Sequence, residues 1–364
     1  MSKQDKLLKV KGLWTPVGDF QASHFDYKHC FLCGISVEER PVTREHIFPR
    51  WLLRKFDLWH RTMTLLNGSD IRYAQLKIPC CSTCNNDYLS KVENVIQRSV
   101  ERGFEQFKEI DELMVYQWLG KIRFGILFKE LSLDKDPKDK QLGKIIDPMV
   151  LHEHQNLHRL LQSVRLPFRF VSNPWSVWIL RSHSYPQKYN FDFWDFYAAL
   201  TVYVRMDNIA IIMCLEDNGY QQQAREDLFS QFDGVTLHPC QLEELAIIAS
   251  YQNALLRRTP EYDTDINLLT GEYTVWSRPL QKYPGENIFD VWDPETYARM
   301  LHFMWKRAGL ADPFESIFPG DGRCYTTLYD ESGKVNVVDM YGQPVNPVST
   351  KNPRRRTLDW QPGL

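Results

Sequence analysis

The sequence predicts an α+β protein, with a small N-terminal module built around cysteine pairs ahead of a larger, mixed α+β region. Five of the eight cysteines fall between Cys30 and Cys84, a clustering that indicates a metal in this segment. Beyond it, strand-like runs and amphipathic helices follow one another without an internal repeat. With 364 residues, 43% of them hydrophobic, the chain is long enough for two or three domains.

Charge and hydropathy exclude two broad classes of protein. The formal net charge is -2, so the chain is not a polycation that coats nucleic acid, although residues 1–110 carry 17 Lys+Arg against 13 Asp+Glu. No apolar run approaches the roughly 20 residues that span a bilayer. The first residues, MSKQDKLLKVKG, lack the apolar core of a secretory signal. We therefore expect a soluble, cytoplasmic protein with no membrane partner.

The chain divides into four predicted parts. Residues 1–29 form an N-terminal extension, residues 30–133 the cysteine module with its following helices, and residues 148–364 an α+β domain of unknown role. Residues 134–147 are the predicted linker, because LDKDPKDKQ is short, charged and interrupted by Pro137.

Apolar periodicity places helices in both large parts. One helical face is made by residues spaced three or four apart: Leu89, Val92, Ile96, Val100 and Phe104. Further helices are expected over ELMVYQWLGKIRFGILFKEL, DPMVLHEHQNLHRLLQSV, CQLEELAIIASYQNALLRR and PETYARMLHFMWKRAGL. A strand is expected over SVWILRSH, and hairpins are expected to turn at Asp207-Asn208 and at Ser332-Gly333.

Two Cys-x-x-Cys pairs frame the N-terminal module. CFLC supplies Cys30 and Cys33, and CSTC supplies Cys81 and Cys84. Two such pairs can present four thiolates tetrahedrally to one structural Zn²⁺, which is the leading interpretation in a cytosolic chain. Cys80 could replace Cys81, but only Cys81 keeps the two-residue gap to Cys84.

The 47 residues between Cys33 and Cys81 exceed the 15–20 or so of a plain zinc ribbon and leave room for an inserted hairpin. This insert contains VTREHIFPRW, with Glu45 beside His46, and Asn85 follows the last cysteine directly. Glu45 and Asn85 offer oxygen ligands for Mg²⁺ or a similar ion, and His46 can take a proton from water. These are the groups that metal-assisted phosphodiester hydrolysis requires.

The segments CFLC, EHIFP and CSTCNN occur in the order found in the zinc-containing branch of the HNH (His-Asn-His, ββα-metal) endonucleases, which residues 28–100 resemble. The resemblance implies an N-terminal ββα-metal nuclease module with structural zinc on the four cysteines named above. It also implies His46 as general base, and Mg²⁺ or Mn²⁺ between Glu45 and Asn85. Asn67 in LLNGSD is the candidate for the bracing asparagine of the family.

This sequence departs from the family at two positions. Family members more often carry Asp where Glu45 stands, and a Gly-Gly turn where this chain has Arg50-Trp51. Each site residue also has an alternative interpretation. Glu45 could be a solvated charge or a salt-bridge partner, and His46 a satisfied surface or core histidine. Asn67 could simply form an Asn-Gly turn, and Asn85 could cap its helix.

For other polar residues near the motif or on predicted helices, the sequence gives weaker evidence of a functional role. Arg50, Arg54, Lys55 and Lys91 flank the motif and could hold a phosphate backbone or form a solvated face. Glu93 lies two helical turns beyond Asn85 and could approach the metal, but we expect an exposed, solvated glutamate. His154 and His158 are one helical turn apart, but with no further ligand nearby a solvent-facing helix surface is expected.

The resemblance therefore implies an endonuclease, a hydrolase that cuts phosphodiester bonds of DNA, with RNA as an open alternative. Double-strand cutting would require a homodimer or two successive nicks. The fusion to an α+β domain fits a role in antiviral (antiphage) defence or in a mobile element, by analogy of fold only. The competing hypothesis is a non-catalytic, zinc-stabilised adaptor that binds nucleic acid or protein.

Overall fold

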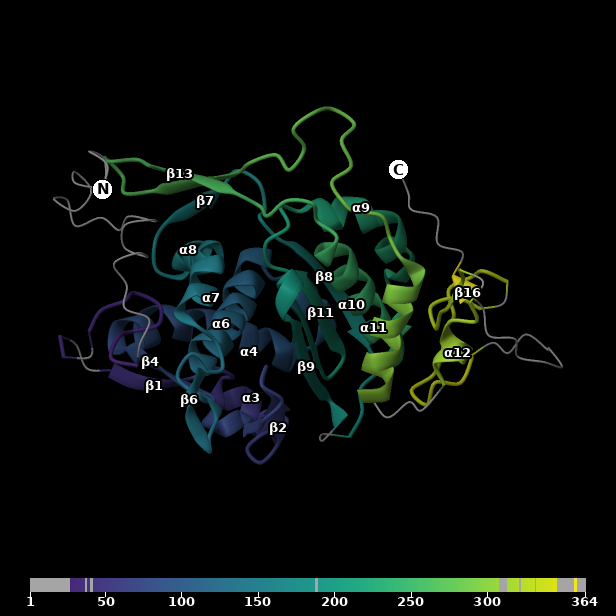
Figure 1. The fold of residues 1–364 in the computed structure, drawn as a ribbon, viewed down its shortest axis with the longest axis horizontal. Coiled ribbons are helices and arrows are strands. Elements are labelled where there is room, and N and C mark those ends of the chain that lie inside the picture. Colours follow the sequence, from purple (N-terminus) through teal and green to yellow (C-terminus); the bar gives the residue numbers. More distant parts are fainter. Residues whose placement is uncertain are drawn as a thin grey trace. The chain divides into compact units, whose positions relative to one another are not determined.

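The computed structural model describes residues 27–36, 38–39, 42–186, 189–307, 313–320, 322–330, 332–345 and 357–358. Most of the predicted N-terminal extension and most of residues 346–364 lie outside the described part. The chain divides into two units, each with its own helices and sheets, which confirms the α+β class (Figure 1). Unit 1 comprises Met1–Arg102, Glu109–Ser172 and Glu261–Arg278, and unit 2 comprises Gly103–Lys108, Asn173–Pro260 and Pro279–Leu364.

Unit 1 contains the cysteine module and a set of helices around it. Its first part runs β1 (Val42–His46), α3 (Arg50–Lys55), β2 (Thr62–Thr64), β3 (Asp70–Arg72), η1 (Tyr73–Gln75), β4 (Lys77–Cys81), η2 (Thr83–Leu89) and α4 (Ser90–Arg102). Its second part comprises α6 (Glu112–Glu130), β5 (Asp134–Asp136), β6 (Asp139–Lys144), α7 (Pro148–Glu153), α8 (Gln155–Leu161), η3 (Gln162–Val164), β7 (Phe168–Phe170), β13 (Tyr262–Ile266) and β14 (Tyr273–Ser277).

An antiparallel strand pair leads directly into a helix in unit 1. Strands β1 and β4 pair in a register that places His46 opposite Lys77 and Val42 opposite Cys81. The chain continues from β4 into η2 and α4, so that β1, β4 and the helix form a strand-strand-helix unit. The intervening residues carry α3 and the β2–β3 hairpin, which accounts for the long spacing between the two cysteine pairs.

Helix α6 is largely buried within unit 1. Asp111 begins it by accepting a hydrogen bond from the Leu113 backbone N–H at 2.9 Å. Apolar residues surround the helix, and its only two buried basic residues within the described part are Lys121 and Arg123. Gly125 lets α6 approach the strand pair, because a Cβ there would lie 3.2 Å from side-chain atoms of Ile47 and Ile78.

The predicted linker differs from the structure. Residues 134–144 form the β5–β6 hairpin within unit 1, and the division between units falls elsewhere. An ion pair between Lys144 and Asp134 at 2.7 Å joins its two strands, and the Asp136 side chain accepts from the Lys138 N–H at 2.8 Å in the turn. The charged, proline-containing run is therefore a hairpin turn, which has the same composition as a linker.

His154 and His158 are buried, so the predicted solvent-facing surface is wrong. His154 Nδ1 lies 2.8 Å from the Val150 carbonyl oxygen, and His158 Nε2 lies 3.1 Å from that of Leu32. Burial lowers the pKa of both imidazoles to about 4. The two histidines therefore act as neutral hydrogen-bonding groups inside unit 1.

Unit 2 is built on a five-stranded sheet in the order β12-β8-β11-β10-β9. Helix α10 packs with α9 and α11 against one face of this sheet, around Tyr203, Ile212 and Leu245. The predicted hairpin turn at Asp207-Asn208 is confirmed, and Asp207 has the positive φ of 52° that such turns require.

The elements of unit 2 are α5 (Phe104–Lys108), β8 (Ser176–Ser182), β9 (Phe191–Phe196), η5 (Tyr197–Ala199), β10 (Thr201–Met206), β11 (Ile209–Cys214), α9 (Tyr220–Phe229), η6 (Ser230–Phe232), β12 (Thr236–Leu237), α10 (Pro239–Ala254), α11 (Pro294–Arg307), α12 (Phe314–Ile317), β15 (Cys324–Tyr325) and β16 (Thr357–Leu358).

The turn expected at Ser332-Gly333 is present, with Tyr329 bridged to Val335 across it. Among the helices within the described ranges, none combines the length and the apolar character needed to cross a membrane.

Candidate functional site

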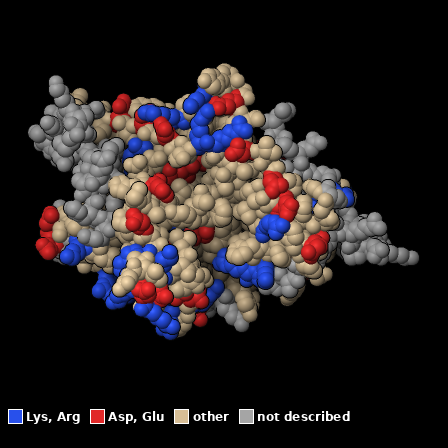
Figure 2. Space-filling model, viewed as in Figure 1, with Lys and Arg blue, Asp and Glu red and all other residues tan. Residues whose placement is uncertain are grey.

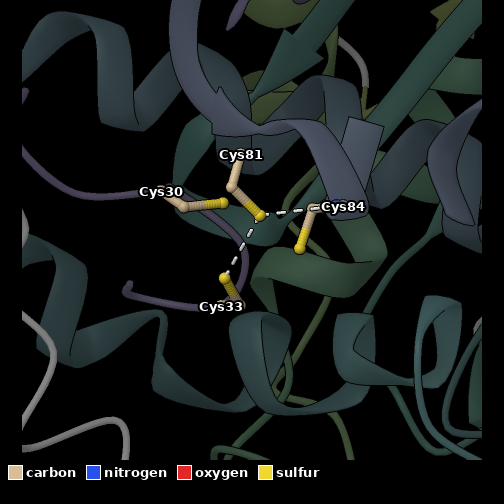
Figure 3. Close-up of side chains that lie close together, drawn as sticks. All are labelled: Cys30, Cys33, Cys81 and Cys84. Atoms are coloured by element: carbon tan, nitrogen blue, oxygen red, sulfur yellow. Dashed lines mark hydrogen bonds between the residues drawn. The ribbon is translucent and has the colours of Figure 1, made fainter. Parts of the chain in front are cut away.

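Four cysteine side chains from two distant segments meet in unit 1 (Figure 3). Cys30 and Cys33 come from the turn before β1, and Cys81 and Cys84 come from the end of β4 and the start of η2. Their sulfur atoms all lie within 4.8 Å of one another. The predicted set is thus brought together with Cys81, not Cys80, as the member that completes it.

The geometry of the cluster fits a metal ion such as zinc. Cys33 Sγ and Cys81 Sγ are 3.7 Å apart, far longer than a disulfide and close to the roughly 3.8 Å edge of a tetrahedron with 2.3 Å Zn–S bonds. The Cys84 backbone N–H points at Cys81 Sγ at 3.4 Å, an interaction that stabilises a thiolate (Figure 3).

Backbone hydrogen bonds hold the first cysteine pair against β4. Within the pair the Gly34 N–H donates to the Cys30 carbonyl at 2.9 Å, and the Phe31 N–H donates to the Pro79 carbonyl at 3.0 Å. The Leu32 carbonyl meets both His158 and the side-chain amide of Gln162, the latter at 2.9 Å. The two buried residues from α8 and η3 therefore fix the turn that presents Cys30 and Cys33.

Next to this cluster, unit 1 contains a cavity of about 550 Å³. It brings Glu45, His46 and Asn85 together, as the sequence predicts. Its lining comprises Thr43, Arg44, Glu45, His46, Pro49, Arg50, Trp51, Lys77, Asn85, Ser90, Glu93, Asn94 and Gln97.

Asn67 is not part of this lining. Its side chain accepts from the Ser69 backbone N–H at 3.1 Å and donates to the Lys135 carbonyl at 2.9 Å. Gly68, which follows it, has a φ of +79°. The structure therefore places Asn67 in the turn of the β2–β3 hairpin, the alternative that its Asn-Gly sequence also predicts.

His46 is a buried, neutral imidazole at the end of β1. Only 5% of the residue is exposed, and its ring stands edge-on to Trp59 with 5.9 Å between the centroids. Burial lowers the pKa of His46 to about 4, and the positive charges of Lys77 and Arg50 act in the same direction. Among the described residues Nδ1 is buried from solvent and has no hydrogen-bond partner.

Asn85 is oriented by β1 and does not cap its helix. It lies inside η2, whose N-cap residue is Ser82, and its Nδ2 donates to Thr43 Oγ1 at 2.8 Å. The Thr43 hydroxyl in turn donates to the Cys80 carbonyl at 3.0 Å. With the amide nitrogen engaged in this way, the Asn85 oxygen is the atom left as a potential metal ligand.

A buried ammonium group lies behind Glu45. Lys121 Nζ donates to Glu45 Oε1 at 2.8 Å and to Glu93 Oε1 at 2.9 Å. It also contacts the carbonyl oxygens of His46 at 2.6 Å and of Ile47 at 3.1 Å. Glu93 is thus a member of a buried ion cluster and not the solvated glutamate expected from the sequence.

Burial and the neighbouring charges act in opposite directions on the pKa values of this cluster. Burial by itself would lower the pKa of Lys121, but the two carboxylates outweigh burial and raise it. The pKa of Glu93 is raised, because burial and the neighbouring Glu45 carboxylate together outweigh the opposing effect of Lys121. Because both carboxylates contribute to the raised pKa of Lys121, we describe the three groups as an ammonium ion held by two carboxylates.

Basic side chains stand on the wall of the cavity. Arg50 is the only one of the four predicted basic residues that lines it, and Arg44 and Lys77 join it there. Elsewhere the charges are mixed: Figure 2 shows Lys and Arg interspersed with Asp and Glu on the visible face. The three basic side chains of the cavity wall can contact an anionic ligand, beside the carboxylates of Glu45 and Glu93 that line the same cavity.

Two functional features escape the sequence patterns. Lys121 had a signal, since it is a lysine inside the otherwise apolar run WLGKI, but such a residue can also extend its charge to the surface. No sequence pattern identified Arg44 and Lys77, because the residues that lie beside each other on paired strands can be named only when the register of the strands is known.

No protein-family model, no curated protein and no solved structure matches this chain.

Proposed function

We propose that this protein is a metal-dependent HNH-type endonuclease that hydrolyses phosphodiester bonds of DNA. The observation that carries the proposal is the convergence of Glu45, His46 and Asn85 on one cavity beside a four-cysteine cluster. The order β1, β4, helix also agrees with the ββα arrangement that the sequence resemblance implies. Zn²⁺ on the cysteines is proposed to be structural.

The side chains in the cavity have complementary chemical capacities. Glu45 Oε2 and the Asn85 amide oxygen would hold Mg²⁺ or Mn²⁺, since their other polar atoms are engaged by Lys121 and Thr43. Such an ion supplies Lewis-acid stabilisation of charge on the phosphate. His46, neutral at physiological pH, would accept the proton of the attacking water, while Arg44, Arg50 and Lys77 would contact phosphate oxygens.

A second function is favoured by one specific observation. Lys121 already satisfies one oxygen of Glu45 and one of Glu93, as a permanent cation would in a site that needs no metal. On this basis the competing proposal is a zinc-stabilised module that binds nucleic acid or protein without cutting it.

Cleavage of supercoiled plasmid tests the proposal against its competitor. We expect the wild-type protein to nick or linearise plasmid with Mg²⁺ or Mn²⁺, and to lose this activity in EDTA. His46→Ala should lower the cleavage rate by at least ~100-fold, the usual contribution of a general base. His60→Ala is the matched control, because His60 is exposed and does not line the cavity.

Equal activity of wild type and His46→Ala would contradict the role of His46. Absence of cleavage by wild type across plasmid, linear duplex and single-stranded DNA, with retained binding, would support the competing module. If the protein cleaves RNA and leaves plasmid intact, the nuclease proposal stands, with RNA and not DNA as the substrate.

A further inference from the structure

The buried ammonium of Lys121 occupies the point at which the two carboxylates of the cavity meet. Four oxygen atoms lie within 3.1 Å of Nζ, two from Glu45 and Glu93 and two from the backbone carbonyls of residues 46 and 47. Only 1% of Lys121 is exposed. An ammonium ion so fully desolvated is costly unless opposite charges and hydrogen bonds compensate it, and all of its donors are used here.

Lys121 therefore does two things to the candidate site. It fixes the rotamer of Glu45 and the backbone that carries His46, because it binds both from a helix that is itself buried. It also sets the charge of the site: with both carboxylates ionised, as they would be beside a bound cation, the three groups sum to -1, whereas the carboxylates alone would sum to -2.

We infer that Lys121 is a positioning residue that holds Glu45 and His46 in place and limits the affinity of the site for its divalent ion, with Glu93 as the second carboxylate that balances it. This inference rests on the proposed function, because it concerns the same metal. A weakened site suits Mg²⁺, which keeps several water molecules and is held by few protein ligands. Without Lys121, the two carboxylates would attract a divalent cation directly.

Four proteins that differ in the charge of the site test this inference. The summed charge of the side chains at positions 45, 93 and 121 is -1 in wild type. It is 0 in Glu93→Gln, -2 in Lys121→Met and again -1 in the double variant Lys121→Met/Glu93→Gln. Met is chosen because it keeps the length of Lys without its charge. Zinc content and far-UV circular dichroism of each full-length protein report whether the fold is retained.

The measurement is the dissociation constant for Mn²⁺, from titration calorimetry or from the electron paramagnetic resonance of free Mn²⁺. We expect Lys121→Met to bind Mn²⁺ about tenfold or more tightly than wild type, and Glu93→Gln to bind it about tenfold or more weakly, because each step changes one unit charge a few ångströms from the ion. The double variant should return close to wild type. Lys121→Met should nevertheless cleave DNA more slowly, because Glu45 and His46 lose their anchor.

Mn²⁺ affinity that does not follow this charge order would overturn the inference while leaving the proposed function intact. If Lys121→Met does not fold, the comparison of Glu93→Gln with wild type decides. Gln keeps a hydrogen-bond acceptor for Lys121, so this variant changes the charge and retains the contact. An unchanged Mn²⁺ affinity in Glu93→Gln would overturn the inference. No Mn²⁺ binding by any of the proteins would overturn both the inference and the proposed metal site.

Discussion

The chemistry of His46 depends on what surrounds it and not on the residue type alone. Burial and the neighbouring cations Lys77 and Arg50 lower its pKa to about 4. An imidazole with this pKa is unprotonated across the neutral range and weakly basic. A water molecule would therefore need a metal ion nearby before such a base could take its proton effectively.

The pH dependence of cleavage follows from this pKa. If His46 is the base, its neutral form persists well below pH 6.5, so kcat/KM should stay nearly constant when the pH falls from 7.5 to 5.5. The pH profile of plasmid nicking in the presence of Mn²⁺ measures this directly. A loss of activity with an apparent pKa near 6.5 would point to a different, solvent-exposed histidine as the base.

Single residues could be predicted from the sequence where the spacing of a motif defines them. Cys30, Cys33, Cys81 and Cys84 follow from two CxxC pairs, and the structure brings their sulfurs together. The partner of Glu45 could not be predicted, because Lys121 lies 76 residues away in a helix with no polar face. An ion pair of this kind is a product of tertiary packing.

At the scale of elements, α6 shows the limits of periodicity. The sequence predicts this helix correctly over Glu112–Glu130. Apolar residues occupy every side, so no pattern could say which face meets the β1–β4 pair. In the structure Gly125 marks that face, because an added Cβ there would lie 3.2 Å from Ile47 and Ile78, a tighter contact than the 3.6 Å between a Cβ at Gly120 and Leu161.

Substituting the two glycines of α6 tests this contact. Gly120→Ala adds a Cβ at 3.6 Å from Leu161, an ordinary contact, and should stabilise the protein by roughly 0.5–1 kcal/mol through helix propensity. Gly125→Ala adds a Cβ at 3.2 Å from Ile47 and Ile78, and crowding of about 1–3 kcal/mol should outweigh the same gain. Urea unfolding measures both. Equal stabilisation by the two variants would show that α6 does not pack closely at Gly125.

His154 gives the α7–α8 region an acid sensitivity. Its pKa is about 4 in the folded protein and near 6.5 when unfolded, so the unfolded state binds more protons between these values. The free energy of unfolding should therefore fall as the pH falls from 6.5 to 4, with a contribution from His154 of about 2 kcal/mol at pH 5. His154→Gln should flatten the pH dependence relative to wild type in urea unfolding at several pH values. Parallel curves for the two proteins would rule out this contribution.

On the scale of the whole molecule, the sequence predicts the α+β class but not the division into units. Residues 261–278 return to unit 1 as β13 and β14, with β14 pairing with β7. Local patterns cannot show this pairing, because 102 residues separate the two strands and 88 of them, Asn173–Pro260, belong to unit 2. Composition placed a boundary at residues 134–147, where the chain instead forms a hairpin.

The zinc content of the purified protein tests whether the four-cysteine cluster beside the candidate site binds a metal ion. We expect about one tightly bound zinc per purified chain, lost in Cys84→Ser together with much of the thermal stability. Cys80→Ser is the matched control, because Cys80 is equally buried but lies outside the four-cysteine set. Loss of zinc in Cys80→Ser together with retained zinc in Cys81→Ser would show that Cys80 replaces Cys81 in the ligand set.

Chemical rescue of His46→Ala is the most direct test of the proposed hydrolysis. The measurement is the single-turnover rate of plasmid cleavage at saturating Mn²⁺ for wild type, His46→Ala and His60→Ala, each with and without added imidazole. We predict a rate at least ~100-fold below wild type for His46→Ala, a rise on adding imidazole, and no change for His60→Ala. A His46→Ala protein that cleaves as fast as wild type would contradict the proposal that His46 activates water in this cavity.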